Sequence, residues 1–184
     1  MPDRPAPEFE VEVRPGFAVT MGALVVVYGA FHALISRRSG VHSSLPESLN
    51  WGAAVTVLIL LGTLLHELGH VAAGLLAGHQ WTKAVLNGAG LGVVIEPRPY
   101  GWQRILRSVA GPVVQLLFAL PLLGIALATA PRSGVPLAVA STSIWWVGGV
   151  GNLFLGVLNA LPIPGLDGGK VVSGVRDLMA RAPR

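Results

Sequence analysis

The sequence contains no cysteine and few charged residues. Among its 184 residues, 12% are Asp, Glu, Lys or Arg, 52% are hydrophobic and none is Cys. Without thiols, disulfide bonds and thiolate metal sites are excluded. Because soluble domains usually carry about 25% charged residues, this composition favours a membrane protein.

The net charge of +4 does not indicate a nucleic-acid-binding surface. The basic residues lie between the apolar runs rather than in one patch, so we expect no nucleic acid partner and interpret the charge as topology information. The first residues, MPDRPAPEFEVEVRPG, contain prolines and acids. A secretory signal needs a basic start and an apolar core there, so no cleaved signal peptide is expected.

Four apolar segments are long enough to span about 30 Å of hydrocarbon. They cover residues 17–35, 51–77, 105–130 and 135–161. Prolines inside the third segment predict kinks rather than breaks, because neighbouring groups in a bundle satisfy the freed carbonyls. The predicted fold class is therefore an α-helical polytopic membrane protein with about four transmembrane helices.

The distribution of basic residues predicts the orientation of these helices. With four spans, both termini and the second-to-third connection share one side of the membrane. Most of the 13 Lys and Arg residues lie on that side, and only Arg37, Arg38 and Arg132 lie on the other. The excess of Lys and Arg in cytoplasmic loops then places both termini in the cytoplasm.

The connection between the second and third spans has the pattern of a β-hairpin. The β-prone runs WTKAVL and LGVVIEP flank the turn-forming NGAG, which predicts a hairpin at about residues 80–98. The segment FEVEVR at residues 9–14 alternates, and both a further strand and a disordered arm remain open for it. We divide the chain into an N-terminal arm (1–16), a core (17–167) and a C-terminal cytoplasmic helix or tail (168–184).

The second span carries ionisable residues in the motif HELGH, residues 66–70. A charge at the centre of a membrane helix costs about 2.5–3.5 kcal/mol. His66 and His70 lie four residues apart on one helix face and could bind one metal ion, with Glu67 beside them to transfer a proton. Two packing histidines are the alternative, but ionisable residues inside membranes usually have a function.

A catalytic zinc ion needs a third protein ligand and an open position for water. His32, His79 and Asp167 are the candidates. The second and fourth spans run in the same direction, so HELGH and Asp167 reach the same half of the membrane, and the PIPG sequence at 162–165 lets the chain loop back. Asp167 could instead cap the following helix. Beside HELGH, the ligand interpretation is favoured.

HELGH within a span, followed by NALPIPGLDGG, resembles the site-2 protease family of intramembrane zinc metalloproteases. The second motif of that family has the form N-x-x-P-x-P-x-L-D-G. Each of its specified positions is present here: Asn159, Pro162, Pro164, Leu166, Asp167 and Gly168. The sequence SVAGPVVQLL and the predicted hairpin are also similar, and the resemblance covers roughly residues 52–170.

The resemblance implies one Zn²⁺ ion on His66, His70 and Asp167, with Glu67 as the catalytic acid and base. It also implies membrane-protein or membrane-peptide substrates, cut in or near their transmembrane segments in the lipid bilayer, and a location in the bacterial plasma membrane. The sequence departs from larger members of the family in having no PDZ or CBS domain. Substrate identity, gating, regulatory partners and homo-oligomers are left open.

Two asparagines and two valines are further candidates for substrate contacts. Asn152 and Asn159 lie seven residues apart on one helix face and could bind the substrate backbone or an oxyanion. Hydrogen bonding between helices is the alternative, and it stays open for Asn152. A substrate helix must unwind before cleavage, and the hairpin could accept it as an added strand at Val85 or Val93.

Two other functional classes remain as alternatives. A membrane zinc-binding protein without hydrolytic activity would need His66, His70 and Asp167, but it would not need Glu67. A catalytically inactive adaptor would need none of the four. The presence of Glu67 favours the enzyme.

Overall fold

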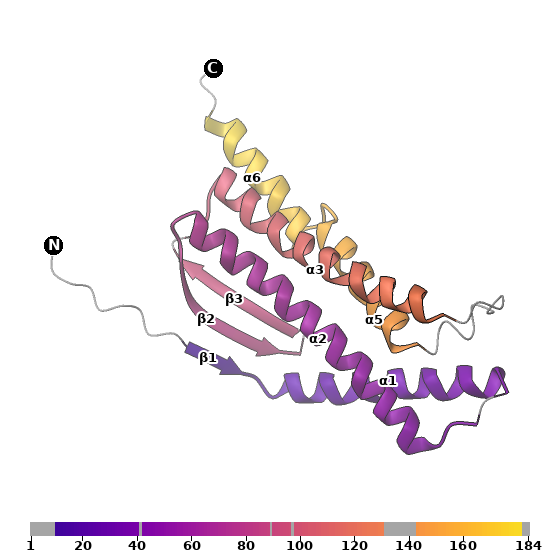
Figure 1. Cartoon of the computed structure of the whole chain (residues 1–184). Helices are drawn as coiled ribbons and strands as arrows, with labels where there is room; N and C mark the ends of the chain where they lie inside the picture. The colour runs from indigo at the N-terminus through magenta and orange to yellow at the C-terminus, as the bar shows by residue number, and fades with distance from the viewer. Residues whose placement is uncertain (1–9, 41, 89, 97, 131–142, 182–184) are drawn as a thin grey trace.

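A computed structural model describes residues 10–40, 42–88, 90–96, 98–130 and 143–181 of the chain. Figure 1 shows a helical bundle with a small sheet at one end. The elements in chain order are strand β1 (Glu10–Val13), helices α1 (Gly16–Arg38) and α2 (Leu45–Leu76), strands β2 (Gln80–Asn87) and β3 (Gly90–Glu96), and helices α3 (Trp102–Thr129), α5 (Ile144–Ala160) and α6 (Asp167–Arg181).

Helices α1, α2 and α3 are long and apolar enough to cross a membrane. Helix α5 is equally apolar in character but has 17 residues. The first part of the predicted fourth span, residues 135–142, lies outside the described residues. Helix α3 continues through both Pro112 and Pro121, as the prediction of a kinked but unbroken membrane helix requires.

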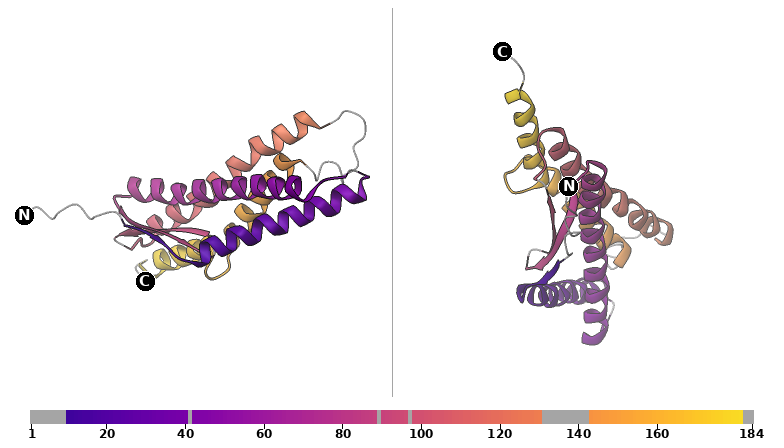
Figure 2. Two further views of the ribbon diagram at one scale, coloured as in Figure 1. Left: turned by 90° about the horizontal axis from the view of Figure 1, so that it is seen from below. Right: turned by 90° about the vertical axis from the view of Figure 1, so that its left-hand side faces the viewer.

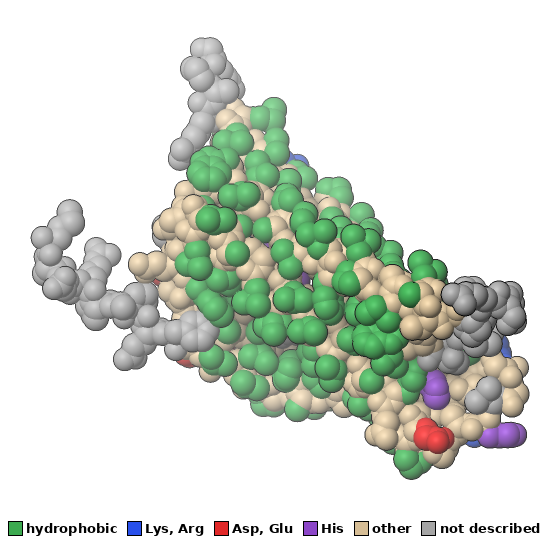
Figure 3. Space-filling view, in the orientation of Figure 1, with side chains coloured by type: hydrophobic (Ala, Val, Ile, Leu, Met, Phe, Trp, Pro, Cys, Tyr) green, Lys and Arg blue, Asp and Glu red, His purple; other side chains and the backbone are tan. Residues whose placement is uncertain are grey.

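The surface of the bundle is apolar over most of its length. Large hydrophobic side chains point outward, such as Val26 and Val27 on α1, which are 59% and 62% exposed. Figure 3 shows hydrophobic side chains covering one face of the molecule, while most of the acidic and histidine surface visible there lies at one end. A surface of this kind suits the hydrocarbon core of a bilayer, where apolar side chains meet lipid at no cost.

Glycines allow the helices of the bundle to approach closely. A Cβ atom added to Gly52 of α2 would overlap the carbonyl oxygen of Val25 in α1, and one added to Gly148 of α5 would lie 2.8 Å from the side chain of Leu58 in α2. Small residues of this kind are typical of contacts between membrane helices. The start of α2 is fixed by a capping box, in which Ser44 and Glu47 bond to each other's backbone N–H groups.

The sheet has three strands in the order β1-β2-β3. Strands β2 and β3 form the expected antiparallel hairpin, and β1 pairs with β2 in parallel, with Val11 opposite Ala84. The segment left open between strand and disordered arm thus contains β1, while residues 1–9 lie outside the described part. Because β2 is the central strand, Val85 faces Glu12 on one side and Gly92 on the other. Only β1 and β3 have an outer edge.

The sheet, the start of α3 and helix α6 lie at the same end of the bundle, whereas the α1–α2 turn lies at the other end (Figures 1 and 2). Helix α6 is fixed to the start of α3 by Asp177. Its carboxylate accepts a hydrogen bond from the Gly101 N–H group at 3.2 Å and forms an ion pair with Arg104 at 3.0 Å. These bonds hold helix α6 against the start of α3.

Candidate metal centre

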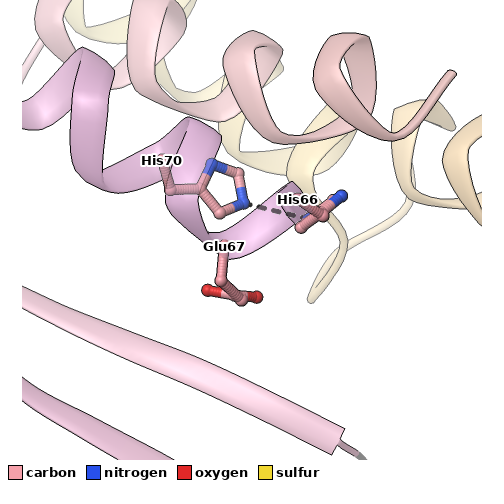
Figure 4. Close-up of side chains that lie close together, drawn as sticks. All are labelled: His66, Glu67 and His70. Carbon is pink, nitrogen blue, oxygen red and sulfur yellow. Dashed lines mark hydrogen bonds between the residues drawn. The ribbon is translucent and has the colours of Figure 1, made fainter. Parts of the chain in front are cut away.

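Helix α2 presents His66, Glu67 and His70 close together, and their potential ligand atoms all lie within 4.8 Å of one another. Both histidines are buried, with exposed fractions of 4% and 5%. Figure 4 shows the two imidazole rings meeting at the dashed bond while Glu67 points away from them toward the strands. The four-residue spacing on one helix face produces this arrangement, as the sequence predicts.

Asp167, the first residue of α6, joins the two histidines. Its Oδ2 atom lies 3.0 Å from Nε2 of His66 and 3.1 Å from Nε2 of His70, and the two Nε2 atoms are 3.1 Å apart. Ligand atoms bound to one zinc ion at about 2.0–2.1 Å with tetrahedral angles lie roughly 3.3–3.4 Å apart. Two imidazole nitrogens and a carboxylate oxygen in a nearly equilateral triangle therefore fit a zinc ion.

The other candidate ligands lie elsewhere. His32 stacks on Trp51 with ring centroids 4.9 Å apart, and its Nδ1 atom lies 3.3 Å from the Ser48 hydroxyl, in the contact between α1 and α2. His79 is buried after the end of α2, with Nδ1 3.3 Å from the Gly74 carbonyl oxygen. Neither belongs to the triangle formed with Asp167.

The turn between α5 and α6 brings Asp167 back to the bundle. Helix α5 ends at Ala160, and Gly165 adopts a φ of +95°, which favours glycine over any L side chain. A Cβ atom on Gly168 would overlap the carbonyl oxygens of Ala160 and Leu161. The second motif thus forms a tight turn in which its glycines permit close backbone approach.

Further hydrogen bonds orient His70 and Asp167, and the residues that make them were not predicted from the sequence. His70 donates a hydrogen bond from Nδ1 to the Arg107 carbonyl oxygen at 2.8 Å, and Lys170 donates one to Oδ1 of Asp167 at 2.7 Å. Burial raises the pKa of Asp167, but hydrogen bonds with the two histidines and Lys170 outweigh it and hold that pKa well below its usual range. The carboxylate is therefore ionised, as a metal ligand must be.

Gly111 on α3 makes room for the imidazole pair. A Cβ atom at this position would lie 2.6 Å from Nε2 of His70 and 2.9 Å from Nε2 of His66. Gly111 belongs to the AGP sequence at the entry to the third span. In the sequence this segment stands out only through the family resemblance. Its glycine is the one feature that could have indicated a close contact between α3 and the histidines.

A cavity of about 400 Å³ adjoins the triangle. Glu67 and Asn159 both line it, together with residues 91–93 of β3. Asn152, on the same helix as Asn159, is fully buried instead. Its Nδ2 atom donates to the carbonyl oxygens of Leu58 and Gly148 at 3.1 Å and 2.8 Å. The two asparagines therefore share a helix face but not an environment.

Comparisons with known proteins agree with this geometry. A family model described as Peptidase M50B-like matches residues 47–160. "Putative zinc metalloprotease sll0528" of Synechocystis sp. is 29% identical over 164 residues, which make up 89% of this chain and 40% of the relative. "Putative zinc metalloprotease Rip3" of Mycobacterium tuberculosis is 31% identical over 167 residues, 85% of this chain and 40% of the relative.

One solved structure, "Site-2 Protease from Methanocaldococcus jannaschii", has the same fold. It superposes with a TM-score of 0.61 over 94% of this chain and 68% of that chain, at 20% sequence identity. The predicted fold class, a polytopic helical membrane protein with a small sheet, is confirmed. The chain spans about 40% of the length of the curated relatives it matches.

Proposed function

Because the chain belongs to the site-2 protease family, through its Peptidase M50B-like match over residues 47–160, we propose that it is an intramembrane zinc metalloprotease. It hydrolyses peptide bonds in or near the transmembrane segments of membrane-protein substrates. The observation that carries this proposal is the convergence of two histidines and Asp167, about a hundred residues apart in sequence, beside a cavity that also contains Glu67. A non-hydrolytic zinc protein would have no need of Glu67.

His66, His70 and Asp167 would hold a single zinc ion through Nε2, Nε2 and Oδ2. Bound zinc supplies Lewis acidity at the scissile carbonyl and lowers the pKa of water to about 7. Glu67 takes the proton of the water whose oxygen attacks the carbonyl carbon, and passes that proton to the amine nitrogen as the C–N bond breaks. The Asn159 amide, in the same cavity, donates a hydrogen bond to the substrate backbone or to the developing oxyanion.

The outer edge of β3 is the best candidate for binding the unwound substrate. Residues 91–93 line the same cavity as Glu67, and the Val93 carbonyl oxygen accepts a hydrogen bond from Arg107 at 3.4 Å. The Leu86 carbonyl oxygen bonds to Arg14, so Ala84, two residues earlier and opposite Val93, turns its backbone groups toward β1 rather than toward Val93. In a strand the N–H and C=O groups of one residue point to the same side, so the Val93 N–H group also faces outward. Val85 lies on the central strand and has no such free side.

Replacing Val93 with proline tests this substrate strand. The change removes an outward N–H donor but no backbone hydrogen bond between β2 and β3. We therefore expect cleavage to fall while the sheet persists. Val93→Ala, which keeps the N–H group, is the matched control and should cleave normally. Unchanged cleavage by Val93→Pro would exclude strand addition at this edge.

The proposed activity is tested by Glu67→Gln. We expect cleavage of a labelled peptide with one transmembrane segment to fall by about 10²–10⁴-fold, the usual contribution of general acid–base catalysis. Zinc content should stay at one ion per chain, and Glu96→Gln, at the exposed end of β3, should be fully active. Cleavage by Glu67→Gln at the wild-type rate would contradict the proposed activity. Membrane proteins that accumulate in the Glu67→Gln strain would identify substrates.

The proposed location is the bacterial plasma membrane with both termini in the cytoplasm. The excess of basic residues on the side of the sheet supports this orientation.

The absence of cysteine makes a direct test of this topology simple, because a single introduced cysteine is the only thiol. Exposed Glu96 ends β3, and exposed His42 lies in the connection between α1 and α2. These two segments lie at opposite ends of the bundle (Figure 1). An impermeant maleimide applied to whole cells should label His42→Cys and leave Glu96→Cys unlabelled, and the reverse pattern would invert the topology.

A further inference from the structure

The two histidines of the triangle differ in what their second ring nitrogen contacts. Nδ1 of His70 donates to the Arg107 carbonyl oxygen, which leaves Nε2 as the free acceptor that a metal needs. Nδ1 of His66 is buried and has no hydrogen-bond partner among the described residues. A metal-binding histidine almost always donates its other N–H group to an acceptor, so His66 requires one.

An acceptor without a partner lies in the same cavity. Gln115 of α3 is 1% exposed and lines this cavity together with His66. Its Nε2 atom donates to Oδ1 of Asn152 at 3.4 Å, but its Oε1 atom is buried and has no partner in the described part of the chain. Burial of an unsatisfied amide oxygen costs about 1–3 kcal/mol, so this oxygen also requires a partner.

The helix contacts place the Gln115 amide within about one helical turn of His66. Gly111, one turn before Gln115 on α3, lies against Nε2 of His66. Gly62, one turn before His66 on α2, lies against the side chain of Asn152, to which the Gln115 amide is bonded. The Gln115 amide is therefore held beside the turn of α2 that precedes His66, a separation that suits a bridging water molecule rather than a direct bond.

We propose that Gln115 is a positioning residue for the metal centre: Nδ1–H of His66 donates a hydrogen bond to one bridging water molecule, and that water donates a hydrogen bond to Oε1 of Gln115. The cavity is polar and, at about 400 Å³, has room for such a water. This hydrogen bond fixes the tautomer of His66, so that the lone pair of Nε2 faces His70 and Asp167. The inference rests on the proposed function, because it concerns the same zinc site.

Gln115→Leu tests the inference through zinc affinity rather than through protease activity. Loss of the acceptor should raise the zinc dissociation constant of the purified protein about 10–100-fold, as is typical when a partner of a metal ligand is removed. Gln115→Glu keeps an acceptor oxygen at the same position and should bind zinc within about threefold of wild type. A role in packing alone would not be rescued by a charged side chain.

A further variant separates the proposed role from helix packing. Gln103→Leu removes another glutamine from α3, bonded to the Ala77 carbonyl oxygen away from the triangle, and its zinc affinity should match wild type. If Gln115→Leu does not fold, Gln115→Met, which has the length of glutamine, carries the same expectation.

The outcomes distinguish the inference from the proposed function. Wild-type affinity in folded Gln115→Leu or Gln115→Met overturns the positioning role, as does equal weakening in Gln115→Glu. A wild-type protein that binds no zinc overturns the proposed function itself.

Discussion

Lys170 binds one of the two carboxylate oxygens of Asp167, with Nζ 2.7 Å from Oδ1. The other oxygen, Oδ2, is thereby turned toward the imidazole pair, 3.0 Å and 3.1 Å from the two Nε2 atoms. Lys170 follows Asp167 by three residues on α6, so the first turn of one helix supplies both the candidate ligand and the group that orients it. The lysine side chain is 53% exposed, which limits the strength of the pair.

Replacement of Lys170 by methionine should weaken zinc binding about tenfold. This is the lower end of the range for partners of metal ligands, because water partly replaces a half-exposed lysine. Competition with a chromogenic chelator measures the change. Lys83→Met is the matched control, since Lys83 pairs with Glu10 and Glu12 in the sheet. Equal affinity in both variants would show that Lys170 does not orient Asp167.

A methyl group at position 111 should disrupt the metal centre. Gly111→Ala introduces a Cβ atom in the space occupied by the imidazoles of His66 and His70, and the bond from Nδ1 of His70 to the Arg107 carbonyl oxygen leaves that ring little freedom to move. We expect zinc affinity and cleavage to fall at least tenfold. Gly124→Ala, on the same helix with nothing within 4 Å of the added atom, should be neutral or slightly stabilising, because alanine is the better helix former. Normal zinc binding by Gly111→Ala would contradict the described packing.

Acid should loosen the first strand of the sheet. Hydrogen bonds from Arg14 and Lys83 lower the pKa of the Glu12 carboxyl from 4.5 to about 2. Because the folded pKa is the lower one, this contribution is complete above pH 4.5 and is lost as the pH falls from about 4.5 to about 2. The protection of the β1 amides against hydrogen exchange, taken relative to the rate of an unstructured chain at the same pH, should fall over that window. Glu12→Gln should be less protected at neutral pH and lack this fall, and an identical profile in both proteins would exclude this pair as the cause.

Removal of zinc should lower the thermal stability of the protein. A ligand that binds only the folded state stabilises it by about 2.7 kcal/mol at 100 times its dissociation constant. In detergent, a chelator should therefore lower the Tm, and added zinc should restore it. The Tm of Asp167→Ala, which lacks one of the three candidate metal ligands, should change far less with the chelator. A Tm that is insensitive to the chelator in wild type would argue against a resident metal ion.

Local patterns predicted the elements and the histidine pair. The spacing of His66 and His70 needs only the period of a helix, and the approach of Asp167 follows from the direction of two spans. The parallel pairing of β1 with β2 was not decided by sequence, because it joins segments about 70 residues apart and turns β2 into a central strand. This long-range pairing is why Val93 keeps a free edge and Val85 does not.

The supporting residues were harder to predict because their types are ordinary. A lysine in an amphipathic helix, such as Lys170, usually faces water, and a glutamine in a membrane helix, such as Gln115, usually bonds to a neighbouring helix. Asn152 and Asn159 share a face of α5, and the helical period gave no means of separating them. Only the contact with α2 and α3 buries the first and leaves the second in the cavity.

The triangle also has a consequence for the folding of a chain without cysteine. His66 and Asp167 are 101 residues apart, so one ion held between them would close a loop that includes β2, β3, α3 and α5. Closing a long loop restricts the unfolded chain and favours the folded one, as a disulfide bond does in secreted proteins. The ion proposed to activate water would thus also tie helix α6 to the bundle, and loss of the metal would then remove a tether as well as the proposed catalyst.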